Sequence, residues 1–199
     1  MKIEVNANYT YETIPDYSDV VEGAKELVVN GHEIGVTYIP DVIYDHKSNI
    51  DLHLQILQPK IMLEPDRIFP CIVFVKGSAW KKQNLYSEIP QLARLAQLGY
   101  VVAEVEYRHS GIAHHPAQII DTKNAIRYMK KNAKQYHVDP QKVIIMGDSS
   151  GGHTSCMTGM TANTELFDEP NDAHYSCEVK CIISLYGALD VSLPYGFPT

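Results

Sequence analysis

Short apolar runs separated by stretches of helical periodicity constrain the fold of this chain more than any other feature. Residues 70–75 form a continuous apolar run, which is typical of a strand buried on both faces of a sheet. Strands are also expected over residues 101–107 and 143–146. Helical spacing separates them over residues 89–96 and again from Pro116 onward. Alternating strands and helices form crossover units, so we expect a parallel sheet with helices on both faces.

The segment before these runs predicts an antiparallel hairpin. Residues 34–44 are rich in β-formers, and apolar and polar residues alternate over residues 50–56. A period of two indicates a strand with one solvent-exposed face, and His53 on its polar side is interpreted as a solvated histidine. The turn-rich residues 45–49 join the two strands at a sheet edge. A last strand is expected over residues 179–186.

Composition narrows the classes of function. With 199 residues and 45% hydrophobic content, the chain is expected to be one α/β domain, with residues 1–30 as an N-terminal extension. The net charge of −7 argues against nucleic acid or an anionic membrane as a partner. No apolar run reaches membrane-spanning length, and the N-terminus has no signal-peptide pattern. The four cysteines lack metal-ligand spacing, so we expect reduced thiols, no metal and a cytoplasmic location.

A G-x-S-x-G sequence, Gly147-Asp148-Ser149-Ser150-Gly151, follows the third strand. Small and apolar residues come next, so the segment predicts a strand, a sharp turn and a helix. In a nucleophile elbow the serine lies at the apex of a strained turn, and the flanking glycines let strand and helix approach closely. A turn without chemistry is the alternative, because glycine and serine are common in turns.

The loop after the first buried strand supports the elbow. It reads Val75-Lys76-Gly77-Ser78-Ala79-Trp80, a turn of small residues followed by the single tryptophan. Acyl transfer on a serine needs N–H donors for the oxyanion, one from the residue after the serine (Ser150) and another from such a loop. Both features fall at the carboxyl ends of strands, where function gathers in parallel sheets.

Taken in order, these motifs resemble the α/β-hydrolases of the esterase/lipase group, which includes hormone-sensitive-lipase-like and small carbohydrate-esterase-like enzymes. The resemblance covers residues 50–190. It is carried by residues 75–80 in place of a His-Gly-Gly-Gly-Trp loop, Leu98-Gly99-Tyr100-Val101-Val102, Glu106-Tyr107-Arg108, His115-Pro116-Ala117 followed by Asp121, and residues 146–153.

The resemblance implies an α/β-hydrolase fold, a mostly parallel sheet with an antiparallel N-terminal hairpin. It implies Ser149 as nucleophile and no metal or organic cofactor. The oxyanion donors that it implies are the backbone N–H groups of Ser150, Ser78 and Ala79, with Gly77 in the same loop.

The sequence departs from the family in two places. The loop has Lys76, Ser78 and Ala79 where the family has histidine and glycines, so its geometry depends on whether those positions require positive φ. In the family an acid and then a histidine follow the serine along the chain. Only 50 residues follow Ser149, so we expect the domain to be incomplete, with the last strands missing.

Other polar residues have less specific interpretations. Asp190, after the expected last strand, is a candidate acid, but a capping role in its loop is favoured. Among the histidines, His153 is expected to support the elbow from behind, and His174 lies in a loop. Arg108 and Asp121 are interpreted as a structural ion pair. His114 and His115 are interpreted as loop residues, one of which could line a pocket. Lys76 is interpreted as an exposed lysine, with contact to an acidic substrate group as the alternative, and Asp148 as a residue that orients the local backbone.

The sequence thus predicts a serine hydrolase that cleaves short-chain carboxylic esters through an acyl-enzyme on Ser149. The alternatives are a catalytically incomplete hydrolase-fold module that binds or supports other molecules, or a peptidase or acyltransferase of the same fold. The expected partner is a small-molecule ester. A homo-oligomer or a further C-terminal segment is expected to cover the apolar sheet edge.

Overall fold

The computed structural model describes residues 10, 12–13, 23–25, 34–61, 65–169 and 175–192. The chain divides into two compact units, residues 1–32 and 33–199. The predicted N-terminal extension, residues 1–30, therefore lies almost wholly outside the described residues. All helices and strands of the described part belong to the second unit.

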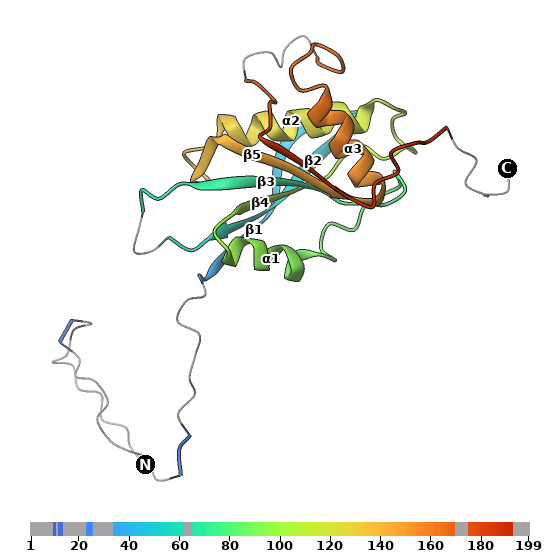
Figure 1. Cartoon of the computed structure of the whole chain (residues 1–199). Helices are drawn as coiled ribbons and strands as arrows, with labels where there is room; N and C mark the ends of the chain where they lie inside the picture. Colours follow the sequence, from blue (N-terminus) through green and yellow to red (C-terminus); the bar gives the residue numbers. More distant parts are fainter. Residues whose placement is uncertain are drawn as a thin grey trace. The chain divides into compact units, whose positions relative to one another are not determined.

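The strands of the second unit form one mixed sheet (Figure 1). In chain order they are β1 (Val36–Lys47), β2 (Ile50–Pro59), β3 (Phe69–Val75), β4 (Val101–Val105), β5 (Val138–Asp148) and β6 (Cys181–Leu185). Their order across the sheet is β1-β2-β4-β3-β5-β6. β2 pairs antiparallel with β1 and β4, and all other pairs are parallel. The predicted hairpin at the edge of a mostly parallel sheet is confirmed.

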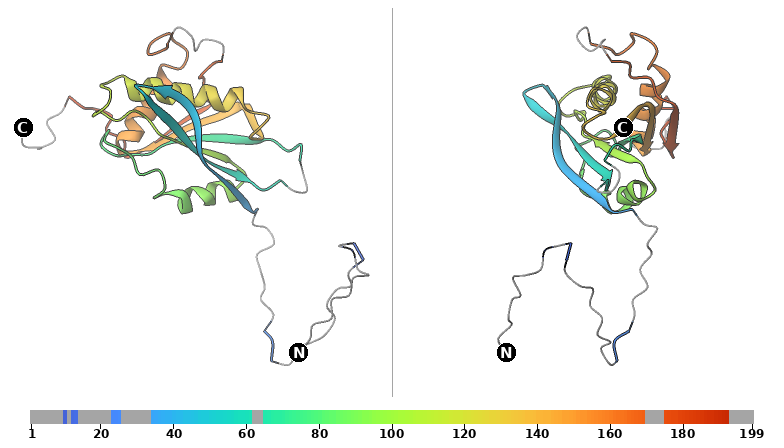
Figure 2. Two further views of the ribbon diagram at one scale, coloured as in Figure 1. Left: turned by 180° about the vertical axis from the view of Figure 1, so that it is seen from behind. Right: turned by 90° about the vertical axis from the view of Figure 1, so that its left-hand side faces the viewer.

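Helices cover both faces of this sheet. They are α1 (Ile89–Gln97), α2 (Ala117–Lys131) and α3 (Ser149–Met160). In Figure 1 α1 lies below the sheet and α2 above it, and α3 packs on the same side as α2. The two further views in Figure 2 show the hairpin curving away from the parallel strands. None of these helices, within the described residues, has the length and apolarity needed to cross a membrane.

The side chains of β3 explain why its sequence is continuously apolar. Cys71, Val73 and Val75 belong to the core under α2, whereas Ile72 and Phe74 belong to the core under α1. All five are at most 4% exposed. A strand with a helix layer on each side needs apolar residues at every position, as the sequence predicted.

The polar face of β2 differs from the prediction, because only part of it is exposed to solvent. Gln55 is fully buried and hydrogen-bonds Tyr38 and Asp41 of β1. His53 is half-buried, and its Nδ1 lies 2.6 Å from a carboxylate oxygen of Glu106. The interpretation of His53 as a solvated histidine was therefore wrong. This face of β2 forms part of the wall of a pocket, and side chains from the chain before α1 form another part.

The strand predicted over residues 101–107 ends at Val105. Glu106 donates its N–H to the His53 carbonyl at 2.9 Å. Tyr107 donates its N–H to the side chain of Gln83 at 3.0 Å. A side chain replaces the neighbouring strand as the partner of Tyr107, so the chain leaves the sheet there.

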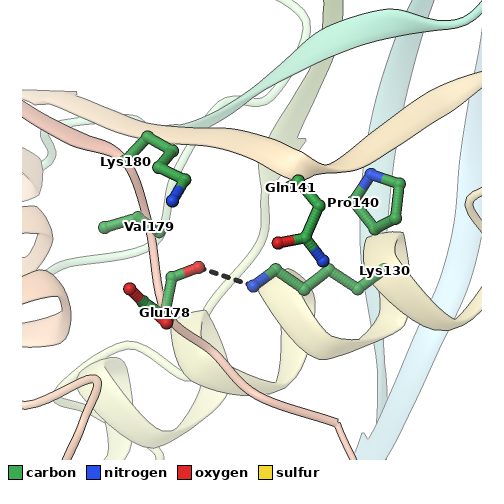
Figure 3. Close-up of a pocket in the computed structure, with 6 residues that line it drawn as sticks. All are labelled: Lys130, Pro140, Gln141, Glu178, Val179 and Lys180. Atoms are coloured by element: carbon green, nitrogen blue, oxygen red, sulfur yellow. Dashed lines mark hydrogen bonds between the residues drawn. The ribbon is translucent and has the colours of Figure 1, made fainter.

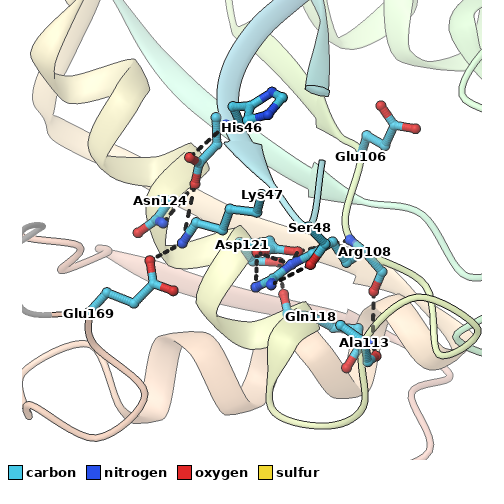
Figure 4. A network of polar contacts seen from close by, with 12 residues as sticks. His46, Lys47, Ser48, Glu106, Arg108, Ala113, Gln118, Asp121, Asn124 and Glu169 are labelled. Carbon is cyan, nitrogen blue, oxygen red and sulfur yellow. Dashed lines mark hydrogen bonds and ion pairs between the residues drawn. The ribbon is translucent and has the colours of Figure 1, made fainter. Parts of the chain in front are cut away.

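A polar network fastens the hairpin turn and the end of β4 to α2 (Figure 4). Arg108 binds the fully buried carboxylate of Asp121, with Nη2 2.8 Å from Oδ1. This confirms the predicted structural ion pair. On the hairpin side, Asn124 of α2 donates to Asp45 at 2.9 Å, and Lys47 pairs with Glu169.

A small polar hollow lies where α2 meets the chain entering β6 (Figure 3). Lys130 donates to the Glu178 carbonyl at 2.6 Å across it. Burial lowers the pKa of Lys130. The hollow has an empty volume of about 200 Å³. The hydrogen bond of Lys130 across it anchors α2 to the chain that enters β6.

All four cysteines are free thiols. Cys71 and Cys177 are buried, and burial raises the pKa of Cys71 to about 12. Cys156 is only partly buried, because it lies on the side of α3 away from the core.

Candidate active site

The G-x-S-x-G segment forms a strained strand-to-helix turn. β5 ends at Asp148 and α3 begins at Ser149. Ser149 has φ of 49°, in the left-handed region that costs an ordinary residue roughly 1 kcal/mol or more. Its side chain is exposed, and we find no hydrogen bond to its hydroxyl from any described residue. The backbone therefore presents the serine at the apex of the turn, as expected for a nucleophile elbow.

The flanking glycines are required by close packing. A Cβ on Gly147 would lie 2.4 Å from the carbonyl oxygen of Gly151. A Cβ on Gly151 would lie 1.9 Å from the carbonyl oxygen of Val75. No side chain fits at either position, so the start of α3 packs directly against the carboxyl ends of β3 and β5.

Most N–H groups of the loop after β3 already have acceptors. Gly77 donates to Asp148 Oδ1 at 2.7 Å, so Asp148 orients the local backbone as expected. Ser78 donates to the hydroxyl oxygen of Ser150 at 2.9 Å, and Trp80 donates to the same oxygen at 3.3 Å. Gly77 and Ser78, both among the predicted oxyanion donors, are therefore occupied in this conformation.

Two of the predicted donors remain open. The N–H of Ala79 has no acceptor among the described residues, and Ala79 has φ of 51°. The N–H of Ser150 lies in the first turn of α3, where helix N–H groups have no intrahelical acceptor. The question that the sequence left open, whether this loop needs positive φ, is answered at Ala79 and at Trp80, which has φ of 56°.

A pocket lies between this loop, α3 and the chain before α2. Its empty volume is about 850 Å³, and its walls come from Ala79, Trp80, Ser110, His114, His115, Gln118, His153 and Val191. The ring of Trp80 stands edge-on to that of His153, with centroids 5.4 Å apart. Burial, with a contribution from the nearby His115, lowers the pKa of His153. The lowered pKa of His153 favours its neutral form, so the imidazole and the indole give this wall little charge.

Of the histidines, His153 differs from its predicted place. His153 contributes to the pocket wall instead of supporting the elbow from behind, and its buried Nδ1 has no partner among the described residues. His114 and His115 line the same pocket. The spacing of four residues between Ser149 and His153 on one helix was a usable signal, because such residues share a face. His174 lies outside the described residues.

Asp190 makes a local turn after β6. Its Oδ1 accepts the N–H of Ser192 at 2.9 Å and the Ser192 hydroxyl at 2.6 Å. This contact agrees with the capping role. The next residue, Val191, lines the pocket.

Beneath the loop after β3 lies a cluster of ionisable side chains, Lys76, Glu88 and Glu104, that the sequence did not predict. Lys76 is largely buried and pairs with Glu88, so its interpretation as an exposed lysine was wrong. Glu104 of β4 is fully buried, and neither of its carboxyl oxygens has a partner among the described residues. Burial, with the neighbouring charge of Glu88, raises the pKa of Glu104 to about 8. An acidic residue inside an apolar strand was the available signal.

A second, polar pocket lies on the α1 side of the sheet. Its empty volume is about 920 Å³, and it is lined by Asp41, His53, Lys82, Gln83, Asn84, Leu85, Tyr86 and Glu106. Asp41 has φ of 52° at a bulge in β1. Among the described residues, no three histidine, cysteine or acidic side chains form a group able to hold a metal ion.

Comparison with known proteins identifies the family. Residues 54–196 match the BD-FAE family, well over half of the chain. The chain belongs to the BD-FAE family. This match includes β3 to β6, the elbow and the loop that faces it, so the residues that build the site lie within the matched region.

Relatives of this BD-FAE chain are esterases. Esterase LipQ of Mycobacterium tuberculosis is 29% identical over 134 residues, which cover 65% of this chain and 31% of LipQ. Butyrate-bound esterase 2 of Thermogutta terrifontis superposes with a TM-score of 0.64 at 26% identity, covering 83% of this chain and 59% of that one. The same esterase phosphorylated by paraoxon superposes with a TM-score of 0.63 at 26% identity, covering 82% of this chain and 62% of that one.

These likenesses establish the α/β-hydrolase fold that the motifs predicted. The chain spans about a third of the length of the curated relatives that it matches.

Proposed function

We propose that this chain carries the nucleophile and oxyanion half of a serine esterase that cleaves short-chain carboxylic esters. The observation that carries the proposal is Ser149, an exposed serine at φ of 49° on a strand-to-helix turn. The names of its relatives support ester hydrolysis, and the butyrate-bound neighbour supports a short acyl group.

In the proposed reaction, Ser149 Oγ attacks the ester carbonyl carbon and its proton passes to a base. The carbonyl oxygen becomes an oxyanion, which accepts hydrogen bonds from the N–H groups of Ser150 and Ala79. Collapse breaks the bond to the alkoxide, which takes that proton from the base and leaves as the alcohol, and an acyl-enzyme remains. Water gives a proton to the same base and attacks the acyl carbon, and the carboxylic acid leaves as the proton returns to Ser149 Oγ. We propose that the base is a histidine outside the described residues, because no described histidine hydrogen-bonds Ser149.

A fluorophosphonate probe tests this role, with the adduct mapped by mass spectrometry. We expect labelling at Ser149 and none in Ser149→Ala. Ser155→Ala is a matched control, because it removes a buried hydroxyl without a partner from the same helix. The chain and the product of its full reading frame should both be treated, and absence of labelling in both would exclude the esterase.

The second candidate is a catalytically incomplete module that binds esters or acids without turning them over. The occupied N–H groups of Gly77 and Ser78 favour it. It predicts butyrate-induced NMR shifts at Trp80 and His153 together with no labelling of Ser149.

We further propose that another polypeptide segment, from a second copy or from a longer chain, covers β6. In the described part of the chain β6 pairs only with β5. The apolar side chains of Ile182 and Leu185 are 37% and 40% exposed.

The four free thiols support a reducing compartment such as the cytoplasm.

A further inference from the structure

The hydroxyl of Ser150 bridges the elbow and the loop that faces it. Ser150 is 2% exposed, and its side chain leaves α3 toward the loop after β3. One oxygen accepts two backbone donors, the N–H of Ser78 at 2.9 Å and that of Trp80 at 3.3 Å. A single side chain thus holds the loop on both sides of Ala79.

This loop has a conformation that needs such support. Ala79 and Trp80 have φ of 51° and 56°, and consecutive left-handed residues other than glycine are unfavourable. Positions of this kind persist where surrounding contacts enforce them. The two hydrogen bonds to Ser150 hold the residues on either side of Ala79. They act together with the N–H of Lys81, which donates to the Ser78 carbonyl at 3.0 Å and closes the turn, and with the N–H of Ser110, which donates to the Trp80 carbonyl at 2.8 Å.

Tyr107 backs the bridge from the other side. It is 2% exposed, and its phenol oxygen lies 2.8 Å from the Ser78 hydroxyl and 3.4 Å from the Lys76 carbonyl oxygen, to which it donates. Its backbone N–H is held by Gln83, whose amide also donates to the Lys76 carbonyl at 3.2 Å. Tyr107 is therefore anchored to the chain on both sides of the loop, through its backbone N–H at Gln83 and through its phenol at the Lys76 carbonyl.

These contacts leave one loop donor for an oxyanion. Gly77 donates to Asp148, and Ser78 and Trp80 donate to Ser150. Among the N–H groups of residues 77–80, only that of Ala79 has no acceptor within the described residues. Donors that are oriented before the reaction stabilise an oxyanion most effectively, because no reorganisation is then needed.

We propose that the Ser150 hydroxyl, backed by Tyr107, is a positioning group that holds the loop left-handed and makes Ala79, rather than Ser78, its oxyanion donor. This inference rests on the proposed esterase function. Ser150 then has two separate parts: its N–H faces the oxyanion, and its hydroxyl orders the second donor.

Ser150→Ala tests the inference, because it removes the hydroxyl and keeps the backbone N–H. The first readout is amide hydrogen exchange of the whole chain, resolved by NMR. We expect exchange at Ser78 and Trp80 to accelerate about tenfold or more in Ser150→Ala, since each N–H loses its acceptor. Ser155→Ala, the same deletion five residues along α3, should leave both rates within about twofold. Unchanged rates in Ser150→Ala would overturn the proposal.

The second readout is the rate of fluorophosphonate labelling at Ser149. We expect Ser150→Ala to lower it on the order of tenfold to a hundredfold, because one donor loses its orientation. Tyr107→Phe should lower it less, and it replaces Ser150→Ala if that variant fails to fold. Faster labelling in Ser150→Ala would overturn the proposal, since it would mean that the hydroxyl withholds Ser78 from the oxyanion.

The two readouts separate failure of this inference from failure of the esterase. If the unmodified chain and its full reading frame both resist labelling, the esterase proposal fails. The exchange rates then still decide whether Ser150 orders the loop, because they require no reaction at Ser149.

Discussion

Gly151 decides how closely α3 can approach β3. Its missing side chain leaves room for the Val75 carbonyl oxygen, which would lie 1.9 Å from a Cβ. That neighbour is backbone in a central strand, so it has no rotamer that moves it aside. Because Gly151 has no side chain, α3 packs closely against β3, and this packing sets the position of Ser149, two residues earlier.

Gly151→Ala should therefore cost stability, by about 2–4 kcal/mol, as expected for severe overpacking. Gly159→Ala is the matched control in the same helix. Its Cβ would meet the partly exposed side chain of Ile182, which can rotate, and alanine favours the helix. Urea unfolding measures both. Equal stability of the two variants would contradict the close-contact argument.

Glu104 should make the stability of the fold depend on pH. Its pKa is raised to about 8 by burial, from 4.5 for the free side chain. Between these values the folded chain holds more protons than the unfolded chain, so the free energy of unfolding falls as pH rises.

Glu104→Gln cannot ionise and should remove this slope. From pH 5 to pH 8 we expect the unmodified chain to lose at least about 1 kcal/mol more than the variant, measured by urea unfolding. Glu165→Gln, at an exposed carboxylate, should keep the original slope. If Glu104→Gln also keeps it, Glu104 is ionised or partnered in the folded chain.

At the scale of elements, the contact between Arg108 and Asp121 fixes where α2 begins relative to the end of β4. Asp121 is fully buried, and it accepts both the guanidinium and the backbone N–H of Arg108. The pattern Glu106-Tyr107-Arg108 followed by Asp121 indicated the pair from sequence. The sequence could not indicate that the same network reaches the hairpin turn at Ser48, because that contact spans 60 residues.

Asp121→Asn should destabilise the domain by about 3–5 kcal/mol, because it leaves a largely buried guanidinium without its charge partner. Asp139→Asn is the comparison. Asp139 pairs with Lys142, whose side chain is 68% exposed, and such surface pairs contribute at most about 1 kcal/mol. A loss in Asp121→Asn no larger than in Asp139→Asn would contradict a structural role for the pair.

At the scale of the whole molecule, β6 presents a sheet edge that can pair with another chain. Its apolar residues are partly exposed, and the chain continues into the exposed Tyr186 and Leu189. Exposed edges of this kind template strand addition. Self-association is therefore the expected behaviour of this chain in isolation.

Ile182→Lys should reduce that association, because a lysine on an edge strand opposes pairing. Sedimentation velocity over a concentration series measures it. Leu98→Lys, at a 74%-exposed leucine after α1, should leave the association unchanged. A monomer at every concentration in the unmodified chain would contradict the edge argument.

The sequence alone determined the order of strands and helices, the elbow at Ser149 and the pair of Arg108 with Asp121, because periodicity and short motifs are local properties. Only the tertiary structure decided which donors of the loop are free and that Glu104 is buried without a partner. It also decided that His53 is paired. These properties depend on contacts between segments far apart in the chain, such as Ser78 with Ser150. Packing sets the distance and direction of such contacts, and no local pattern encodes them.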